Sequence, residues 1–344
     1  METTPFTLLI GILLSLSSHV QSLKFPLTMP YVSPRLPNGE SYLCTGVAVD
    51  PETPLYITGF TPTASQDTVH HLMVVGCEYP VSGVDINLWN CGGTLSEAGL
   101  PNPGGTCPGS MATQILYMWS LEADGLQFPP DVSLTVGGNS SVRHLVLQVH
   151  YVSNQFIPEE GDTSGVIVDF QENPTDFSAG IVSLHVHGKI PAGGIAYWDS
   201  ACRLLGSTAI QPWAFLGHTH HHGKLVTGWY VSENQTWTGL GKSNPQMPQR
   251  FDPIMNERIL VPGDILASRC VMQAADDEQD VMQGLSSEME MCDFFLYFWT
   301  RREDFLSSPA GQQCTNKGPP EVSWGTMGLS NIPAESYLIK HFEK

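Results

Sequence analysis

The sequence predicts an all-β protein, and two observations support that prediction. Its 33 glycines and 26 prolines interrupt the chain every few residues and leave little room for long helices. Between these breaks lie short apolar runs such as Leu145–Tyr151, which have the length and composition of buried strands. A hydrophobic content of 41% over 344 residues can supply a full core. At this length we expect two domains, with one large domain as the alternative.

Residues 1–22 have the pattern of a secretory signal peptide. An apolar stretch from Phe6 to Leu16 is followed by small residues that suit signal peptidase, and we place cleavage near Ser22. An uncleaved membrane anchor is the alternative, but this stretch is short of the roughly 20 residues needed to cross a bilayer. No later apolar stretch reaches that length. We therefore expect a secreted protein without a stable membrane anchor.

Eight cysteines are scattered along the chain, and an even number in a secreted protein predicts four disulfides. Zinc binding is the alternative, but the sequence contains no CxxC pair. The cysteines form two groups, with a polar, turn-rich segment over 153–162 in the gap between them. We therefore expect a signal peptide over 1–22, an N-terminal domain over 23–155, a C-terminal domain over 156–320 and a loop-like tail over 321–344.

The formal net charge of −19 argues against nucleic acid as a partner. A solvated acidic surface is the common interpretation of such a charge, and attraction of cationic substrates is the alternative. Two sequons, Asn139-Ser-Ser141 and Asn234-Gln-Thr236, predict N-glycosylation at Asn139 and Asn234.

His70 and His71 are adjacent, and adjacency restricts how they can act together. Neighbours in a regular strand point to opposite faces, so two adjacent histidines share one metal only at a strand end or a distortion. Asp67-Thr68, directly before them, provides such a beginning. His150 lies in an otherwise apolar strand, where an imidazole needs a partner, and is the candidate for the third ligand.

His218 and His220 are separated by one residue, a spacing that places both imidazoles on one face of a strand as a bidentate clamp. His221 and His222 follow directly, so an unspecific polyhistidine patch is the alternative. The segment His185-Val-His187 has the same spacing and no other support, which shows that the pattern alone is weak.

Met289 and Met291 lie just before Cys292. Methionines are usually core filler. Beside two imidazoles, however, a thioether is a soft ligand that favours Cu(I), as a centre that meets dioxygen in its reduced form requires. Zinc has no redox chemistry and would gain little from it.

Four segments of the chain, in this order, resemble the metal-site motifs of the peptidylglycine α-hydroxylating monooxygenases. The segments are Thr68–Cys77, Leu147–Tyr151, Gly217–Lys224 and Glu290–Cys292. The resemblance extends from about Leu27 to Pro320. Between the motifs it is supported by Ile115–Tyr117, Asn244–Pro248 and Gly263–Cys270.

The resemblance implies specific ligands and disulfides. It places an electron-storing copper on His70, His71 and His150, and the copper that activates oxygen on His218, His220 and Met291. The disulfides that it implies are Cys44 with Cys91, Cys77 with Cys107, Cys202 with Cys314, and Cys270 with Cys292. The implied fold is two antiparallel β-sandwiches of jelly-roll type, with one copper on each and the substrate between them.

The implied reaction is hydroxylation of the Cα of a C-terminal glycine in a peptide, with dioxygen and two electrons from ascorbate. This is the first step of C-terminal peptide amidation. Gln148 helps to order the path between the coppers or, alternatively, makes a structural hydrogen bond. No second catalytic region follows the copper core, so we expect a separate lyase to act on the hydroxyglycine product.

Two positions depart from the family pattern. Peptide-binding members place an arginine and a tyrosine, both for the substrate carboxylate, where this sequence has Leu216 and Phe295. An apolar residue cannot replace a bidentate guanidinium, so another cation, for example Arg203 or Arg143, has to fill in. The alternatives are an enzyme of the same family with a small substrate, as for dopamine β-monooxygenase, and a secreted copper-binding protein without turnover.

Overall fold

The computed structural model describes residues 23–36, 39–83, 87–92, 99–109, 114–319 and 321–337. The predicted signal peptide lies outside these residues. The described chain is built almost entirely of strands, with single 3-10 turns at η3 (Arg302–Ser307) and η4 (Ala334–Ser336), which confirms the all-β prediction. Within these ranges, no helix has the length and apolar character needed to span a membrane.

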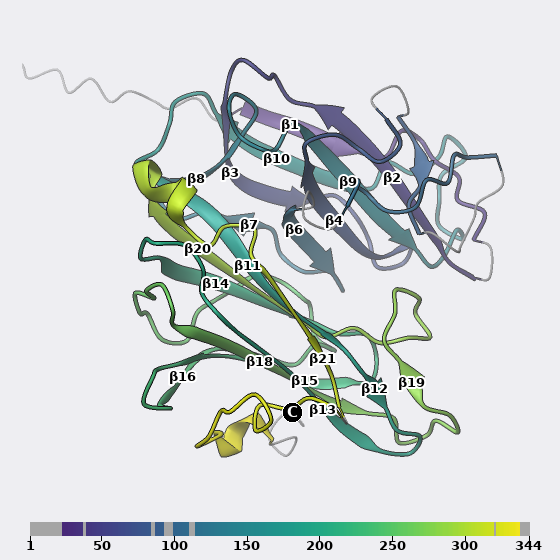
Figure 1. Cartoon of the computed structure of the whole chain (residues 1–344). Helices are drawn as coiled ribbons and strands as arrows, with labels where there is room; N and C mark the ends of the chain where they lie inside the picture. Colours follow the sequence, from purple (N-terminus) through teal and green to yellow (C-terminus); the bar gives the residue numbers. More distant parts are fainter. Residues whose placement is uncertain are drawn as a thin grey trace, which may run out of the picture.

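The N-terminal half is a sandwich of two sheet regions (Figure 1). One is a five-stranded sheet in the order β5-β2-β9-β4-β6, whose strands are β2 (Ser41–Ala48), β4 (Val69–Cys77), β5 (Trp89–Asn90), β6 (Gln114–Ser120) and β9 (His144–Tyr151). The other has the order β1-β10-β3-β8, with β7 paired to β3, and contains β1 (Leu23–Thr28), β3 (Leu55–Pro62), β7 (Leu126–Gln127), β8 (Val132–Val136) and β10 (Gly165–Gln171).

The C-terminal half repeats this two-layer plan. Its first layer contains β11 (Phe177–His187), β14 (Gln211–His218), β17 (Asp252–Pro253), β20 (Asp293–Arg301) and β21 (Gln313–Lys317). The second layer, in the order β13-β18-β15-β16, contains β13 (Ile195–Arg203), β15 (Gly223–Val231), β16 (Trp237–Ser243) and β18 (Ile265–Gln273). A separate ribbon pairs β12 (Lys189–Ile190) with β19 (Val281–Met282).

The two halves share one continuous sheet and one core. Strand β8 of the N-terminal half pairs in parallel with the start of β11, through Val132 and Phe177. Figure 1 shows β11 running from this contact down into the C-terminal half. The Tyr297 hydroxyl, on β20, donates a hydrogen bond to the Leu116 carbonyl on β6. Apolar residues from both halves belong to a single buried cluster, which fixes the halves against each other.

The expected domain boundary near residue 155 falls in the segment between β9 and β10. Strand β10 follows that position in the sequence, yet it pairs with β1 and β3 of the N-terminal half. The physical reason is burial, because Val166, Val168 and Phe170 complete the N-terminal core. The strands up to β10 therefore belong to the N-terminal half, and those from β11 onward, after residue 171, belong to the C-terminal half.

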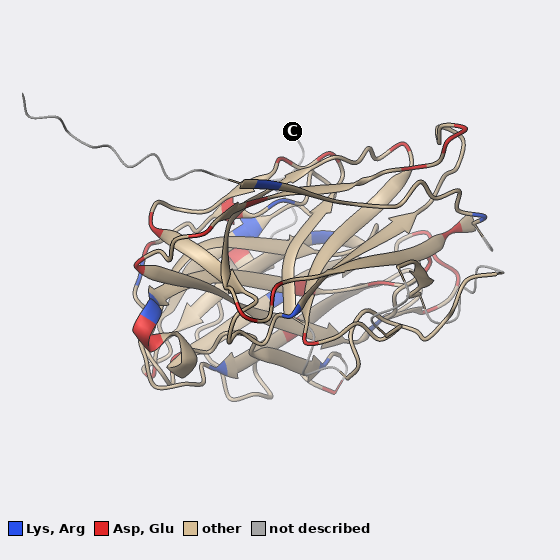
Figure 2. Ribbon diagram, turned by 90° about the horizontal axis from the view of Figure 1, so that it is seen from above, with Lys and Arg blue, Asp and Glu red and all other residues tan. Residues whose placement is uncertain are grey.

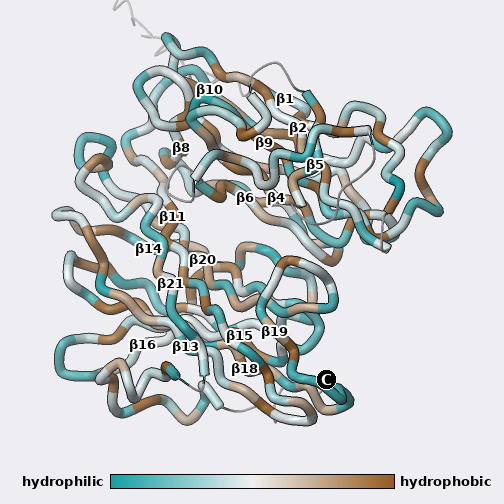
Figure 3. Tube along the Cα trace, turned by 45° about the vertical axis from the view of Figure 1, so that its right-hand side comes forward, coloured by the Kyte–Doolittle hydropathy of each residue, from teal (hydrophilic) through white to brown (hydrophobic). Residues whose placement is uncertain are grey.

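Hydrophobic residues recur along the strands, and many of the loops carry hydrophilic residues (Figure 3). In β9 the odd-numbered residues Leu145, Leu147 and Val149 face the main core, whereas Val146 belongs to the cluster around the N-terminal disulfides. His150 has the same parity as Val146, and this explains how a histidine can stand in a strand that is otherwise apolar.

All eight cysteines form disulfides, in the pairs Cys44–Cys91, Cys77–Cys107, Cys202–Cys314 and Cys270–Cys292. These are the pairs that the resemblance implies. Each joins two segments within one half of the molecule.

The segment expected as a loop-like tail packs onto the second layer of the C-terminal half over its described part, residues 321–337. Trp324 is fully buried and donates from Nε1 to the Ser200 carbonyl (2.9 Å). Its ring also lies 4.2 Å from the guanidinium carbon of Arg269, which forms a buried ion pair with Asp199.

Acidic side chains are spread over many loops and are not gathered on one face (Figure 2). This distribution fits a solvated acidic surface. Asn139 and Asn234, of the two sequons, are both exposed.

Candidate metal centre

His70 and His71 lie at the start of β4, where the strand is distorted. The pairing of β4 with β9 shifts register between Val69 and His71. The shift allows the two adjacent side chains to reach the same side, and their Nδ1 atoms lie 3.1 Å apart. The distortion that the sequence required at this position is therefore present.

His150 completes the first set of imidazoles. One ring nitrogen from each of His70, His71 and His150 lies within 4.8 Å of the others. His71 and His150 are buried, and the His150 ring stacks on Tyr42 with a centroid distance of 3.9 Å. Three imidazoles that converge at this spacing form a candidate metal site.

Glu40 selects the His150 nitrogen that faces this site. His150 donates from Nε2 to Glu40 Oε2 (2.8 Å), whereas Nδ1 is buried and has no hydrogen-bond partner among the described residues. The Ser287 amide, from the C-terminal half, also donates to Glu40 Oε2 (3.2 Å). Burial opposes ionisation of Glu40, but these hydrogen bonds outweigh it and lower its pKa. The carboxylate thus holds the tautomer of a histidine and contacts both halves.

Burial keeps these imidazoles neutral. It lowers the pKa of His70 to about 3 and that of His71 well below its ordinary value, and neighbouring imidazoles add to both effects. Burial also lowers the pKa of His150, against the opposing effect of Glu40. A neutral imidazole offers a lone pair, so the set is ready to accept a metal ion.

His218, the last residue of β14, and His220, in the following turn, form the second set. Their ring centroids are 5.4 Å apart. His218 donates from Nδ1 to Gln249 Oε1 (2.5 Å), and His220 donates from Nδ1 to the Met289 carbonyl (2.8 Å). The Nε2 atoms of both rings are buried and have no partner within the described chain. Both histidines thus present the same open nitrogen.

Glu290 connects this turn to the segment that carries Met291. Its side chain is fully buried, and Oε2 accepts from the amides of His220 (2.9 Å) and Met291 (3.0 Å). Its Oε1 accepts from the amide of His222 (2.7 Å). One carboxylate therefore fixes the backbone on both sides of the second set, with Met291 beside it.

The polyhistidine alternative does not describe this turn. Both ring nitrogens of His222 have carboxylate partners. Nδ1 lies 3.2 Å from Glu290 Oε1, and Nε2 lies 3.0 Å from Asp277 Oδ2. His221 is exposed, and the partial desolvation of its ring lowers its pKa. The four histidines of this segment thus have different surroundings, and among them His218 and His220 have buried ring nitrogens without a partner in the described chain.

The two sets of histidines meet at the contact between the halves. The rings of His70 and His220 are 5.9 Å apart, and those of His71 and His218 are 6.0 Å apart, both edge to face. The sandwich architecture thus places two candidate metal sites next to each other, one from each half.

Sequence reasoning missed the residues that orient these ligands. Glu40 precedes β2 without a recognisable motif, and Gln249 lies just beyond a segment that supports the resemblance. Glu290 belongs to the fourth motif, but nothing in the sequence indicates its contacts. Gln148 was a candidate for the path between the coppers, and its amide contacts the sulfur of Cys91 at 3.6 Å.

Leu216 and Phe295 stand opposite each other on β14 and β20 and are buried. Neither arginine suggested as a substitute cation is close to them. Arg203, at the end of β13, donates to the Gly263 carbonyl, and Arg143, before β9, donates to the Pro51 carbonyl, both on exposed surface.

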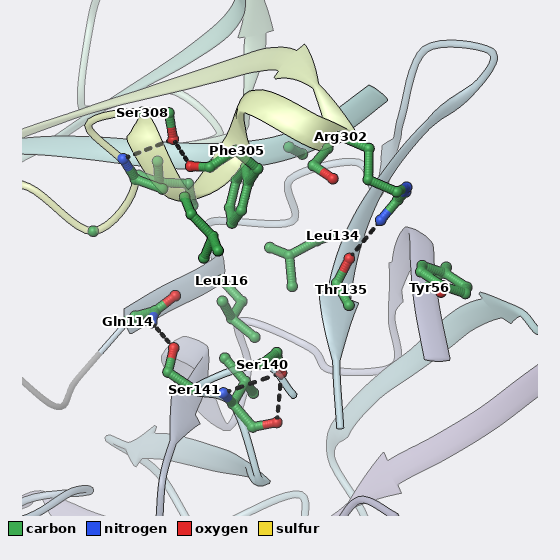
Figure 4. A pocket seen from close by; sticks show the side chains of 18 of the residues that line it. Tyr56, Gln114, Leu116, Leu134, Thr135, Ser140, Ser141, Arg302, Phe305 and Ser308 are labelled. Atoms are coloured by element: carbon green, nitrogen blue, oxygen red, sulfur yellow. Dashed lines mark hydrogen bonds between the residues drawn. The ribbon is translucent and has the colours of Figure 1, made fainter. Parts of the chain in front are cut away.

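A cavity of about 710 Å³ lies between the halves. Figure 4 shows Leu116, Leu134 and Phe305 pointing into it, with Arg302 hydrogen-bonded to Thr135 at its edge. Its lining also includes Ser183 and Phe295. Arg302 is engaged in hydrogen bonds to Thr135 and Ser133 and to the backbone of Thr175 and Phe177.

Five histidines in two facing sets, one set from each half, form two neighbouring candidate metal sites. Residues 25–157 match the family model of the copper type II ascorbate-dependent monooxygenase, N-terminal domain, and residues 177–327 match that of the C-terminal domain. The chain belongs to the copper type II, ascorbate-dependent monooxygenase family.

The relatives in this family include enzymes named for two kinds of substrate. The peptidylglycine alpha-amidating monooxygenase of Rattus norvegicus is 32% identical over 308 residues, covering 89% of this chain and 29% of that protein. The Xenopus laevis peptidyl-glycine alpha-amidating monooxygenase A is 30% identical over 307 residues, 89% of this chain and 31% of that protein. Dopamine beta-hydroxylase of Canis lupus familiaris is 23% identical over 286 residues, 78% of this chain and 44% of that protein. The chain spans about a third of the length of the amidating relatives.

Proposed function

We propose that this chain is an ascorbate-dependent copper monooxygenase that hydroxylates the Cα of a C-terminal glycine in peptides. The observation that carries the proposal is the pair of facing histidine sets, in which His150, His218 and His220 each keep one buried ring nitrogen open. A buried nitrogen without a partner costs stability, and a bound metal ion removes that cost.

The residues fit copper at both sites. His70, His71 and His150 would supply three imidazoles to one ion, and His218, His220 and Met291 would supply two imidazoles and a thioether to the other. Imidazoles suit both copper oxidation states, and the soft sulfur favours Cu(I) at the second site. Copper bound there supplies one-electron redox chemistry and the activation of dioxygen.

The chain itself contributes fixed, dry and neutral ligands. Glu40, Gln249 and the Met289 carbonyl each hold one ring by the nitrogen that faces away from the site, so little reorganisation is needed when electrons move. Burial of the rings excludes water from the space between the sets. The cavity between the halves, whose lining includes Phe295 on β20, offers room for a substrate of several residues.

The glycine-extended peptide is proposed because relatives that are 30 and 32% identical over 89% of this chain are named as amidating enzymes. We further propose that a separate lyase releases the amide from the hydroxyglycine product, and that the protein acts in the secretory pathway or outside the cell, with glycans at Asn139 and Asn234. A small apolar amine is the second candidate substrate, favoured by the buried, apolar pair Leu216 and Phe295.

Oxygen uptake tests the function directly. The copper-loaded protein is expected to consume dioxygen with a peptide that ends in glycine, and only when ascorbate is present. A peptide that ends in proline instead of glycine serves as the control substrate. The proline Cα carries one hydrogen where that of glycine carries two, and the proline nitrogen has no N–H. Absence of uptake with every glycine-extended peptide, together with uptake on 2-phenylethylamine, would replace the first candidate by the second. Absence of uptake with both would leave copper binding without turnover.

A further inference from the structure

One polar cluster beside the second histidine set has no part in holding the ligands. It consists of Ser183 and His185 on β11 and Asp293 on β20. His185 donates from Nδ1 to Asp293 Oδ1 (2.7 Å), and its Nε2 lies 2.8 Å from Ser183 Oγ. The Asp293 side chain is only 7% exposed, whereas that of His185 is 21% exposed. The imidazole is thus hydrogen-bonded at both nitrogens, and part of the ring is exposed.

The strand register places this cluster beside His218. His185 pairs with Asp293 across β11 and β20, and Asp293 pairs with His218 across β20 and β14. Residues that stand opposite each other in neighbouring strands project to the same face of the sheet. Two strand spacings separate the backbones of His185 and His218, roughly 9.5 Å. The cluster therefore lies on the face that carries the second metal set, within reach of a small group bound there.

The cluster also borders the cavity between the halves. Ser183 pairs with Phe295, and both residues line that cavity. A molecule in the cavity can therefore approach the His185 ring past Ser183. The lining beside Ser183 includes the apolar residues Leu116 and Ile181, and His185 lies behind Ser183 on the same strand.

The charges of the cluster suit an anion. Burial alone would lower the pKa of His185, but the charge of Asp293 and its hydrogen bond outweigh burial and raise it. A protonated ring carries a donor at both nitrogens, one committed to Asp293 and the other directed toward Ser183. The Ser183 hydroxyl can rotate to donate as well.

We propose that His185 and Ser183 together bind the C-terminal carboxylate of the substrate, with the His185 Nε2–H shared between Ser183 Oγ and the carboxylate and the Ser183 hydroxyl as the second donor. The inference rests on the proposed function and deepens it. His185 would thus bind the substrate carboxylate, which the apolar side chains of Leu216 and Phe295 cannot do. Asp293 would be a positioning residue that fixes the imidazole. The inference also gives a role to the His185-Val-His187 motif, which the metal sites leave unused.

Calorimetric binding to the copper-loaded protein without ascorbate tests the proposal. The probes are N-benzoylglycine, its uncharged carboxamide and 2-phenylethylamine. We expect the unaltered protein to prefer the acid to the carboxamide at least tenfold. His185→Gln is expected to reduce the affinity for the acid at least tenfold and to leave that for the carboxamide unchanged. His187→Gln, at the exposed end of the same strand, is the matched control and is expected to retain the preference.

His185→Arg provides a second variant, because it keeps a cation that can pair with Asp293. It is expected to retain the preference for the acid. The proposal is overturned if His185→Gln keeps the preference, or if the unaltered protein binds the amine and not the acid, which would make Asp293 an amine anchor. A loss of carboxamide affinity in His185→Gln would indicate damage to the fold, and the result with His185→Arg then decides.

Because binding is measured without turnover, the carboxylate anchor at His185 and the proposed hydroxylase function can be refuted independently of each other. If selectivity for the acid depends on His185 but no glycine-extended peptide is hydroxylated, the anchor stands and the proposed function falls. If such peptides are hydroxylated and His185→Gln has an unchanged KM, the function stands and the anchor falls.

Discussion

Three histidines of the candidate metal centre each use one ring nitrogen in a hydrogen bond and leave the other open. The open atom differs between the sets, with Nδ1 at His150 and Nε2 at His218 and His220. The difference follows from the acceptors, since Glu40, Gln249 and the Met289 carbonyl each take a proton from the opposite nitrogen. Residues outside the metal sites therefore decide which atoms can bind the metal.

At the scale of single residues, the proposed role of Met291 as a copper ligand can be tested by comparison with its neighbour Met289. Met291→Ala removes the thioether proposed for the second site, so we expect bound copper to fall from two ions per chain toward one and hydroxylation to be lost. Met289→Ala is the matched control, because the Met289 side chain is partly exposed and only its carbonyl contacts His220. Copper content is measured by atomic absorption after dialysis. Full activity in Met291→Ala would remove this residue from the site.

At the scale of elements, the strand ends and turns position the ligands. The irregular start of β4 brings two adjacent histidines to one side, and the turn after β14 is tied through Glu290 to the segment before β20. These segments are short, so their geometry depends on the sheets that they join.

The packed C-terminal segment gives an element-scale prediction about stability. Trp324 is fully buried against β13, β15 and β18, and Trp324→Ala should lower the free energy of unfolding by about 3 kcal/mol or more. Leu306→Ala, at a side chain that is 98% exposed, should change it by less than about 0.5 kcal/mol. Urea denaturation of the copper-free proteins measures both values. Equal stability of the two variants would mean that segment 321–337 adds little to the fold.

At the scale of the whole molecule, the contact between the halves gathers the histidines in a buried patch. Their burial lowers the pKa values of His70, His71, His150 and His218. Below an ordinary histidine pKa of 6.5 the unfolded chain therefore binds protons that the folded, copper-free protein does not.

The copper-free protein is expected to lose stability as the pH falls from about 7 to 5. Each such histidine contributes up to about 1.4 kcal/mol per pH unit, and the effect extends down toward the folded pKa, about 3 for His70. The raised pKa of His185 acts in the opposite direction, but it is one histidine against five, because the pKa of His221 is lowered as well. Urea denaturation over this range should show a shallower dependence in a His70→Gln, His71→Gln double variant. An identical slope would contradict the prediction.

The sequence by itself determined the all-β class, because frequent glycines and prolines and short apolar runs are local properties of the chain. It also indicated the histidines and Met291, since their spacing and order resemble a family whose motifs are local too. The distortion at His70 and His71 followed from the alternation of side chains in a strand. The disulfide pairs came from the resemblance, and the structure contains them.

Only the tertiary structure decided which residues that are distant in the sequence contact each other. The return of β10 to the N-terminal sheet, the contacts of Glu40 and Gln249 with histidines 110 and 31 residues away, and the pair of His185 with Asp293 depend on strand pairing and domain contact. A local pattern can specify that a side chain is buried, but its partner is set by the register between strands, and that register is a property of the whole fold.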